Sequence, residues 1–498
     1  MADVAPRKIS RLVPRNQKVL IACLILVSVV DSVLVGFDSS LMGSLNVMPT
    51  YSAYFTLTTT TKSLNTAISY VGGATMAPIA GYLSEKRGRR ECVMWSALIA
   101  LIGGVIQGSA QNIGMFIAGR FIVGAGMALA QTAAPTLVAE ITPVKYRGFA
   151  LGMYYACWSV GTLIAAGVCY GTQNINSTFA WRIPSLLQAA PSVVCFVILL
   201  FIPESPRWLI SHDRHDEAIE ILTIANGGSQ EEVMVQYREI ADTIAFEKTK
   251  SLSVLQAFSQ KANRKRLLIV STFSIMVMLP GTNIITFYFG DMLEGAGIKN
   301  PNTQLQINVI LVSWSLVIAV LSSWYTDVLG RKKLCASSIS LQAIFLMIFG
   351  GLTSLYGNGS NTSGVYGTIA LIFLYNAAYS WGITPLTVLY PPEVLSYDIR
   401  AAGMGIYTFT TKCCGLLVSM AVPFGLQAIG WKFYIVNACF DVLMVVFVIF
   451  VWVETRGLSL EEVDALFDKD KREIVAEQVK AETKVEIFHA EVANKGDV

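Results

Sequence analysis

Twelve long apolar runs limit what this chain of 498 residues can fold into. A bilayer core of about 30 Å is crossed by about 20 residues of α-helix, and each run is about that long or longer. The runs form two sets of six, separated by one long polar stretch. They cover residues 19–46, 64–84, 93–111, 114–139, 149–172 and 183–202, then 267–293, 305–326, 334–356, 364–389, 401–427 and 431–453. The sequence therefore predicts an all-α membrane protein with 12 transmembrane helices.

The composition excludes several other classes of protein. Hydrophobic residues make up 54% of the chain and charged residues only 14%, whereas soluble domains carry about 25% charged residues. The net charge of +3 gives no indication of nucleic-acid binding. Nine cysteines without Cys-x-x-Cys spacing and only three histidines predict neither a metal site nor a cofactor. We find no nucleophile–base arrangement and no phosphate-binding glycine loop, so we do not expect an enzyme.

Basic residues predict the orientation and the domain boundaries. They concentrate in the segments on the side of the N-terminus, so both termini should be cytoplasmic. The expected order is a tail (1–18), a six-helix bundle (19–202), a cytoplasmic linker with amphipathic helices (203–266), a second bundle (267–453) and a tail (454–498). Three Asn-x-Ser/Thr sequons fall in loops on the outer side and are possible glycosylation sites, namely Asn176, Asn358 and Asn361.

The two halves of the chain repeat the same charged motifs. Gly81-Tyr-Leu-Ser-Glu-Lys-Arg-Gly-Arg-Arg follows the second run, and Ser323-Trp-Tyr-Thr-Asp-Val-Leu-Gly-Arg-Lys follows the eighth. Matching pairs follow runs four and ten, and runs six and twelve. We interpret these charges as a cytoplasmic gate whose ion pairs hold the two bundles together when the inner side is shut and break when it opens; the alternative is that the arginines only obey the positive-inside rule. The gate candidates are Glu85, Arg89, Glu140, Arg147, Glu204, Arg207, Asp327, Arg331, Glu393 and Arg400.

These motifs resemble the signatures of the sugar porter family of the major facilitator superfamily. The resemblance covers residues 15–470 and includes Pro203-Glu-Ser-Pro-Arg-Trp-Leu and Val453-Glu-Thr-Arg-Gly-Leu-Ser-Leu-Glu-Glu. Gly36-Phe-Asp-Ser-Ser-Leu-Met-Gly looks most like the fungal lactose-permease-type and disaccharide-permease-type branch. The resemblance implies the major facilitator fold, two pseudo-symmetric six-helix bundles, and a substrate site between them near the midplane. It also implies that the protein lies in the plasma membrane. Because one chain already contains a complete two-bundle pathway, we expect a functional monomer.

Ionisable residues inside the apolar runs are functional candidates because their burial in a membrane is costly. In proton-coupled members of the family that the chain resembles, the residue at Asp38 is protonated and the arginine at Arg120 is its partner. Asp31 lies seven residues before Asp38, on nearly the same helix face. Two roles stay open for Asp31, namely a role in the transport pathway and a hydrogen bond within the bundle. Lys412 could form a buried pair with Asp441 or face an anionic substrate.

The resemblance also implies part of a substrate site. Asn283, Phe287 and Tyr288 match the family's asparagine and aromatic pair in span seven, and Trp381 matches its tryptophan in span ten. The chain departs from the hexose porters elsewhere, because Val277-Met278 replaces a Gln-Gln pair. Thr162 and Ser315 likewise stand where those porters have glutamine and asparagine. Aromatic residues that could line the cavity instead are Tyr155, Trp158, Trp314, Tyr375 and Tyr407.

These observations favour a proton-coupled carrier for a sugar, such as a disaccharide or another non-hexose, that works by alternating access. Its partners would be the small-molecule substrate, protons and membrane lipid. A carrier or exporter of another small metabolite, such as an organic acid or secondary product, stays open because of Lys412 and the missing amides. A nutrient receptor that does not transport is disfavoured, because such receptors tend to have much longer cytoplasmic tails.

Overall fold

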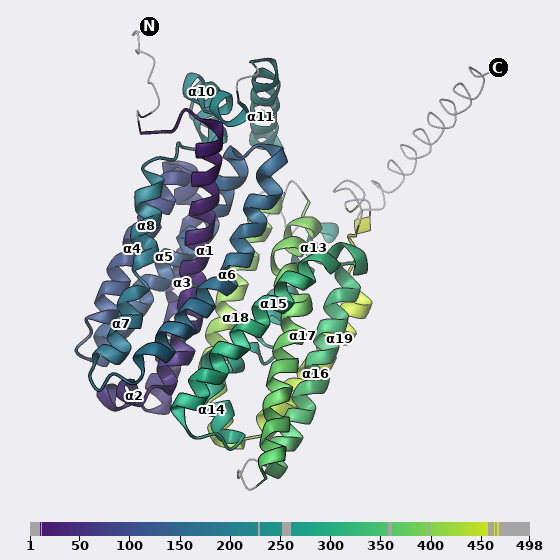
Figure 1. Ribbon diagram of the computed structural model, residues 1–498. Helices are drawn as coiled ribbons and strands as arrows, with labels where there is room; N and C mark the ends of the chain where they lie inside the picture. Colours follow the sequence, from purple (N-terminus) through teal and green to yellow (C-terminus); the bar gives the residue numbers. More distant parts are fainter. Residues whose placement is uncertain are drawn as a thin grey trace, which may run out of the picture.

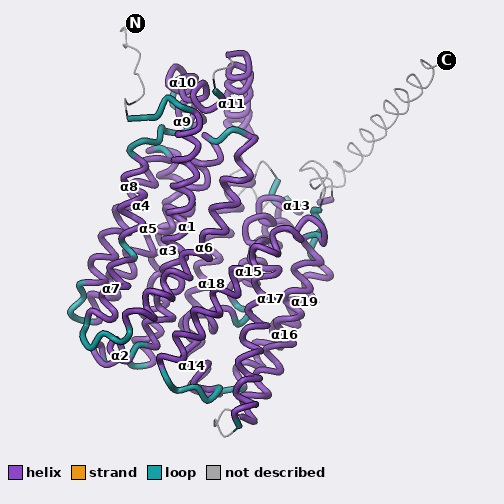
Figure 2. The backbone as a smooth tube through the Cα atoms, in the orientation of Figure 1, coloured by secondary structure: helices purple, strands orange, loops and turns teal. Residues whose placement is uncertain are grey.

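The chain was analysed as a computed structural model, which describes residues 10, 12–227, 230–250, 260–356, 361–396, 399–456, 463, 466 and 467. Within these ranges every regular element is a helix, as Figure 2 shows. The side chains of some described residues, including those of Arg147, Tyr155 and Asp327, lie outside the description, as does Asn358 entirely. Two six-span bundles stand side by side (Figure 1).

The first bundle contains eight helices, of which α2 is short and α7 and α8 together make one span. Polar side chains cap several of them: Asn16 accepts a hydrogen bond from the Lys18 amide, and Thr58 forms a capping box with Thr61. The helices are α1 (Gln17–Val47), α2 (Pro49–Phe55), α3 (Thr59–Arg87), α4 (Arg89–Gly108), α5 (Ile113–Ile141), α6 (Val144–Thr172), α7 (Phe179–Leu187) and α8 (Ala190–Leu199).

In the described part of the segment between the bundles, three helices follow: α9 (Pro206–Ser211), α10 (His215–Asn226) and α11 (Gln230–Lys250). They lie at the end of the molecule where α1 begins (Figure 1). Arg15 forms an ion pair with Glu220, and the Gln17 amide donates to the Ala225 carbonyl at 2.7 Å. The helices expected in this segment are therefore present, and they dock on the first bundle.

Seven helices make up the described part of the second bundle, and its first span is broken in two. The break falls at Pro280-Gly281, where proline lacks an amide N–H and Gly281 has φ +28°. The Asn283 amide donates to the Met278 carbonyl at 2.7 Å and so satisfies part of the interrupted backbone. The helices are α13 (Lys261–Met278), α14 (Thr282–Gly295), α15 (Pro301–Leu329), α16 (Arg331–Tyr356), α17 (Thr362–Val394), α18 (Arg400–Ile429) and α19 (Lys432–Val451).

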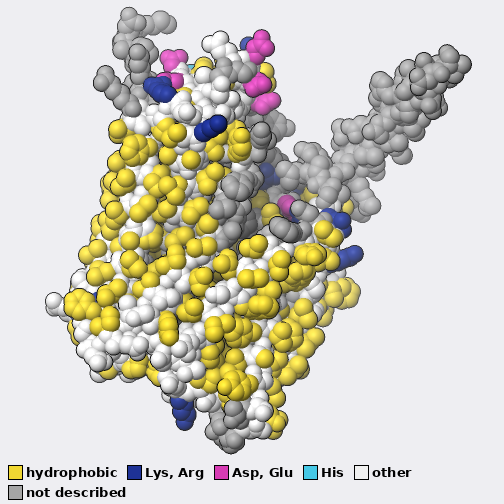
Figure 3. All heavy atoms as spheres, viewed as in Figure 1, with side chains coloured by type: hydrophobic (Ala, Val, Ile, Leu, Met, Phe, Trp, Pro, Cys, Tyr) yellow, Lys and Arg dark blue, Asp and Glu magenta, His cyan; other side chains and the backbone are white. Residues whose placement is uncertain are grey.

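Hydropathy and length agree with membrane crossing. In the described parts of the chain, ten helical stretches are long and apolar enough to span a bilayer. Of the two other spans, α3 is less apolar, and the described apolar part of α6 is shorter. Figure 3 shows hydrophobic side chains over the sides of both bundles, while charged side chains gather near the two ends. This distribution is the one expected for a protein surrounded by lipid.

Glycines allow α1 and α6 to touch along their backbones. A methyl group on Gly161 would lie 2.9 Å from the Phe37 amide nitrogen and closer still to the Val33 carbonyl oxygen. A methyl group on Gly36 would in turn collide with the Trp158 carbonyl. Small residues that permit such close approach are the usual basis of helix packing in membranes. The contact fixes two helices that both contribute to the central cavity.

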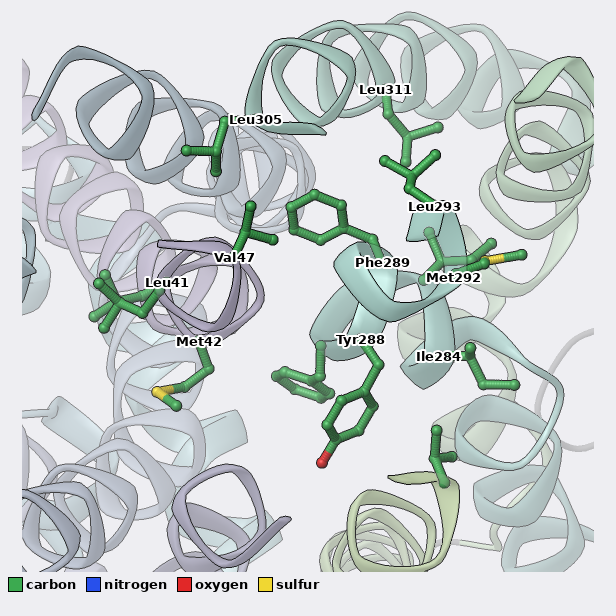
Figure 4. Close-up of a cluster of buried hydrophobic side chains, with 14 of the residues drawn as sticks. Leu41, Met42, Val47, Ile284, Tyr288, Phe289, Met292, Leu293, Leu305 and Leu311 are labelled. Carbon is green, nitrogen blue, oxygen red and sulfur yellow. The ribbon is translucent and has the colours of Figure 1, made fainter. Parts of the chain in front are cut away.

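We call the end with α9, α10 and α11 the terminus face, and the end with α2 and α14 the distal face. The bundles meet through α3 with α18, α6 with α15 and α1 with α14. Figure 4 shows the apolar part of this junction, with side chains from α1, α14 and α15 packed together. Its labelled members are Leu41, Met42, Val47, Ile284, Tyr288, Phe289, Met292, Leu293, Leu305 and Leu311.

Candidate functional site

A cavity lies between the two bundles. Its walls come from α1 and α6 of the first bundle and from α14, α15 and α17 of the second. None of the described residues that line it carries a formal charge. Hydroxyl and amide groups dominate its polar surface, contributed by Ser40, Ser159, Thr162, Thr282, Thr286, Asn308, Ser315, Tyr375, Asn376, Tyr379, Ser380 and Thr384. Such a lining can hydrogen-bond a neutral, polyhydroxylated ligand.

Two of the six predicted substrate residues line this cavity, namely Thr162 and Ser315. The others lie on neighbouring positions but contact protein groups. The Asn283 amide donates to the Met278 carbonyl at the break between α13 and α14, and the Tyr288 hydroxyl donates to the Ser419 carbonyl at 2.7 Å. The ring of Phe287 packs edge-on against Tyr70, and Trp381 packs against Tyr325. These four are not among the residues that line the cavity, and their polar groups and rings contact other parts of the protein.

The cavity also contains residues that the sequence analysis missed. On α17, Asn376, Ser380 and Thr384 recur at intervals of four, which puts them on one helix face. This polar stripe in an apolar run was a usable signal. Of the aromatic candidates, Trp158 and Tyr375 line the cavity, whereas the Trp314 indole bonds the Phe373 carbonyl and the Tyr407 hydroxyl bonds the Thr387 carbonyl.

Beside the cavity, α1 and α5 bring Asp38 and Arg120 together in a buried ion pair. The Gln188 amide donates to the same Asp38 oxygen at 2.5 Å, and Arg120 also approaches the Asn65 carbonyl, at 3.4 Å. Ser40, two residues after Asp38, lies in the cavity wall. The structure thus joins the two residues that the sequence paired, and it adds Gln188, a lone amide in an apolar run that the sequence analysis passed over.

Three other charged residues lie inside the spans. The Tyr154 hydroxyl donates to Asp31 at 3.0 Å. Lys412 on α18 donates to Gln131 on α5 at 3.0 Å, so it joins the two bundles. Asp441 is fully buried, and neither of its carboxylate oxygens has a hydrogen-bond partner among the described residues. The expected Lys412–Asp441 pair is therefore wrong, because Lys412 points to the first bundle.

At the terminus face, a cluster of charges ties together the helix ends of the first bundle. Arg89 pairs with Glu140, with a closest distance of 3.1 Å between Nε and Oε2. The backbone amides of Arg89 and Arg90 donate to Glu204 at 2.9 and 3.0 Å. Burial raises the pKa of the Glu204 carboxyl above its ordinary value of 4.5, although these amides and that of Ser205 oppose the shift. Glu204 therefore acts as a half-buried cap at the start of α4.

The second bundle repeats this arrangement. Arg331 pairs with Glu393 at 2.9 Å, and the Arg331 amide donates to Glu454 at 2.8 Å. Gly88 and Gly330 precede the two arginines, with φ +104° and +87°, and a methyl group on either would collide with the glutamate that caps the helix. The internal repeat inferred from sequence is thus a structural repeat.

The ion pairs named in these clusters each lie within one bundle, and in this structure they do not join the two bundles. Glu85 has an exposed side chain, and its backbone carbonyl accepts from the Trp208 indole at 2.7 Å. Arg400 approaches the Leu395 carbonyl at 3.4 Å, also within its bundle. Arg207 lies at the start of α9. The side chains of Arg147 and Asp327 lie outside the described residues.

Contacts between the bundles instead concentrate at the distal face. Lys62 on α3 pairs with Asp291 on α14 through both carboxylate oxygens, at 2.6 and 2.7 Å. The Asn308 amide donates to the Ser44 hydroxyl at 3.2 Å, and the Gln306 amide donates to the Tyr170 hydroxyl at 2.9 Å. These contacts join the two bundles at the distal face.

Comparison with known proteins gives a consistent result. Residues 24–467 match the family described as "Sugar (and other) transporter". The chain is 30% identical over 446 residues to the MFS-type transporter criB of Aspergillus cristatus, covering 88% of this chain and 91% of that protein. It is 29% identical to the arabinose-proton symporter of Bacillus subtilis, covering 80% and 85%.

Among solved structures, the inward-open conformation of the xylose transporter XylE from E. coli has a similar fold. The TM-score is 0.75 at 22% sequence identity, and the match covers 90% of this chain and all of that one. An identity this low supports the fold alone.

Proposed function

The chain belongs to the sugar (and other) transporter family of the major facilitator superfamily, and from this we propose that it is a proton-coupled carrier of a neutral sugar. As a member of a family of transporters it is a multi-pass membrane protein and not an enzyme. We further propose that it stands closest to the fungal lactose-permease-type and disaccharide-permease-type branch, and that a disaccharide or another non-hexose is its substrate.

The observation that carries the proposal is the uncharged, hydroxyl-rich cavity between the bundles. Trp158 and Tyr375 offer aromatic surface for the C–H faces of a sugar, and Asn308 and Asn376 offer paired donors and acceptors for its hydroxyls. A charged substrate would find no counter-charge among the described lining residues.

Proton coupling is supported by the pairing of Asp38 with Arg120. The Arg120 guanidinium is the counter-charge of the buried Asp38 carboxylate. If the two separate in a water-poor interior, the neutral acid is favoured and Asp38 takes up a proton. Binding of sugar near Ser40, two residues along α1, would then be linked to the protonation of Asp38.

Alternating access follows from the same geometry. The bundles are joined at the distal face by contacts such as Lys62–Asp291, while the named terminus-face clusters stay within each bundle. We propose that the terminus face is cytoplasmic, so that this conformation is closed to the outside. Asn176 and Asn361 are exposed at the distal face, as glycosylation would require. We also propose a monomer in the plasma membrane.

The test is uptake of labelled glucose, lactose, cellobiose, an acidic sugar and a carboxylic acid in transporter-null yeast, at pH 5 and 7.5. A protonophore should abolish accumulation of a neutral sugar by the wild type. Asp38→Asn, which keeps the side-chain shape but cannot ionise, should lose accumulation at least tenfold with normal surface expression. Sugar uptake that persists in both cases would show a passive carrier and refute proton coupling.

A carrier of another small metabolite, such as an organic acid, is the second candidate. Lys412 favours it, because an anion that entered between the bundles would meet this cation. Uptake of the carboxylic acid but of no sugar, lost in Lys412→Gln, would support this function. Uptake of a neutral sugar that is insensitive to Lys412→Gln would exclude it.

A further inference from the structure

A second buried acid lies deeper in the first bundle than Asp38. Asp31 precedes Asp38 by seven residues on α1, so it lies about 10 Å nearer the terminus face on almost the same side of the helix. Tyr154 on α6 donates to it, and Cys195 on α8 lies within electrostatic range of it. The mechanism proposed above gives Asp31 no role.

The helix α8 runs antiparallel to α1 and fixes which residues face each other. Gln188, just before α8, bonds Asp38, and Cys195, seven residues later, lies near Asp31. Ser192 is four residues after Gln188, which places it on the same face at a height between the two acids. Because α1 and α8 pack against each other, Ser192 lies on α8 at a height between Asp38 and Asp31.

The polar atoms along this line are incompletely bonded. The Gln188 Oε1, Ser192 Oγ and Ser28 Oγ atoms are buried and have no hydrogen-bond partner among the described residues. Ser28 lies one turn beyond Asp31 toward the terminus face. These three residues and the two acids are at most 4% exposed. Buried polar atoms are normally bonded, and ordered water supplies the bond where the protein does not.

We propose that Asp38, Gln188, Ser192, Asp31 and Ser28 form a water-bridged path that carries the coupled proton from Asp38 toward the cytoplasm. In this step protonated Asp38 loses its proton and the Asp31 carboxylate gains one through bridging water, so the net charge of the bundle is unchanged. Asp38 then pairs again with Arg120, and Asp31 releases the proton at its own, cytoplasmic end of the path. This inference rests on the proposed proton coupling and on a cytoplasmic terminus face.

The path runs inside one bundle, so a proton could leave without passing through the sugar cavity. Asp31 and Ser192 are not among the residues that line the cavity. Substituting Asp31 or Ser192 should therefore impair proton release and leave sugar binding intact. This separation distinguishes a proton relay from a structural role.

The experiment compares two modes of transport in proteoliposomes, with the neutral sugar that the wild type accumulates in the uptake panel. Exchange of labelled for unlabelled sugar needs no net proton release, whereas accumulation driven by a pH gradient does. Asp31→Asn should reduce accumulation at least tenfold and leave exchange within about twofold. Ser192→Val, which removes only the hydroxyl, should slow accumulation several-fold, and Asp31→Glu should restore it. Asp441→Asn is the matched control, another buried carboxyl, and should accumulate normally.

The outcomes separate the two proposals. If Asp38→Asn accumulates sugar normally, proton coupling itself is wrong. If Asp38→Asn fails but Asp31→Asn and Ser192→Val accumulate like the wild type, coupling stands and the path is wrong. A readout without substrate is infrared difference spectroscopy of the purified protein between pH 5 and 8. A carboxylic-acid band that disappears in Asp31→Asn and shifts in Ser192→Val supports the path, and an unchanged spectrum overturns it.

Discussion

The ion pair between Lys62 and Asp291 should hold the distal face closed. Lys62 belongs to the first bundle and Asp291 to the second, and their side chains are 20% and 33% exposed. Replacing Lys62 by Gln leaves Asp291 unpaired in this partly buried position. Asp291→Asn likewise leaves Lys62 unpaired. Either change should shift the protein toward a conformation that is open at the distal face.

The size of the shift follows from the geometry. Two unit charges about 3 Å apart attract by about 5 kcal/mol at an effective dielectric constant of about 20. Desolvation, side-chain ordering and solvent screening offset most of this attraction for a partly exposed pair. A net contribution of about 1–2 kcal/mol remains, which changes the ratio of closed to open molecules about 5- to 30-fold.

Hydrogen–deuterium exchange of the purified protein measures this shift directly. In Lys62→Gln, amides of α14 and of the first turns of α3 should exchange faster than in the wild type, and the terminus-face ends of α5 and α17 should exchange more slowly. Lys432→Gln is the control, since Lys432 is exposed on the same face and lies over the Trp431 ring, 6.0 Å from its centroid.

The double variant Lys62→Asp with Asp291→Lys should show hydrogen–deuterium exchange close to that of the wild type, because it restores an ion pair with the charges reversed. Unchanged exchange in both single variants would refute the idea that this pair closes the distal face. If hydrogen–deuterium exchange is as perturbed in the double variant as in the single variants, the side chains act through packing rather than charge.

Three further predictions concern stability, measured by thermal unfolding in detergent. Gly161→Ala should lower the melting temperature markedly, because its methyl group forces α1 away from α6 at a cost of about 1–3 kcal/mol; Gly167→Ala on the same helix, with open space around it, should be neutral or slightly stabilising. Asp441→Leu should raise the melting temperature, since it removes a buried, unbonded carboxyl; a lower value would reveal a partner. Because burial raises the pKa of Glu204, the folded state binds its proton more tightly, so the wild type should lose stability relative to Glu204→Gln as pH rises from about 4.5; parallel pH profiles would contradict this.

Most of the architecture could be predicted because hydropathy alone locates membrane spans. The apolar runs 305–326 and 334–356, for example, became α15 and α16 with ends shifted by only a few residues. The break at Pro280-Gly281 was missed, because membrane helices tolerate proline and glycine and the run 267–293 stays apolar throughout. Apolar composition alone does not indicate where a helix ends and begins again within a run.

The site was only partly predictable for a different reason. Asp38 and Arg120 could be paired because each is a charged residue inside a span, at a position that matches a known motif. The partner of Lys412 could not, since Gln131 is uncharged and lies 281 residues away. Spacing along a chain gives the depth of a residue in the membrane but not the direction in which its helix turns toward its neighbours.

The duplicated clusters at Arg89 and Arg331 have a mechanical consequence. Each ties neighbouring helix ends to one another, so each bundle should behave as a stiff lever with its fulcrum near the distal contacts. A lever as long as α3, with 29 residues, extends roughly 44 Å. Tilting it by about ten degrees therefore displaces its free end by roughly 8 Å. A displacement of that size is comparable to the width of a sugar ring, so a small rotation suffices to open or close the way out.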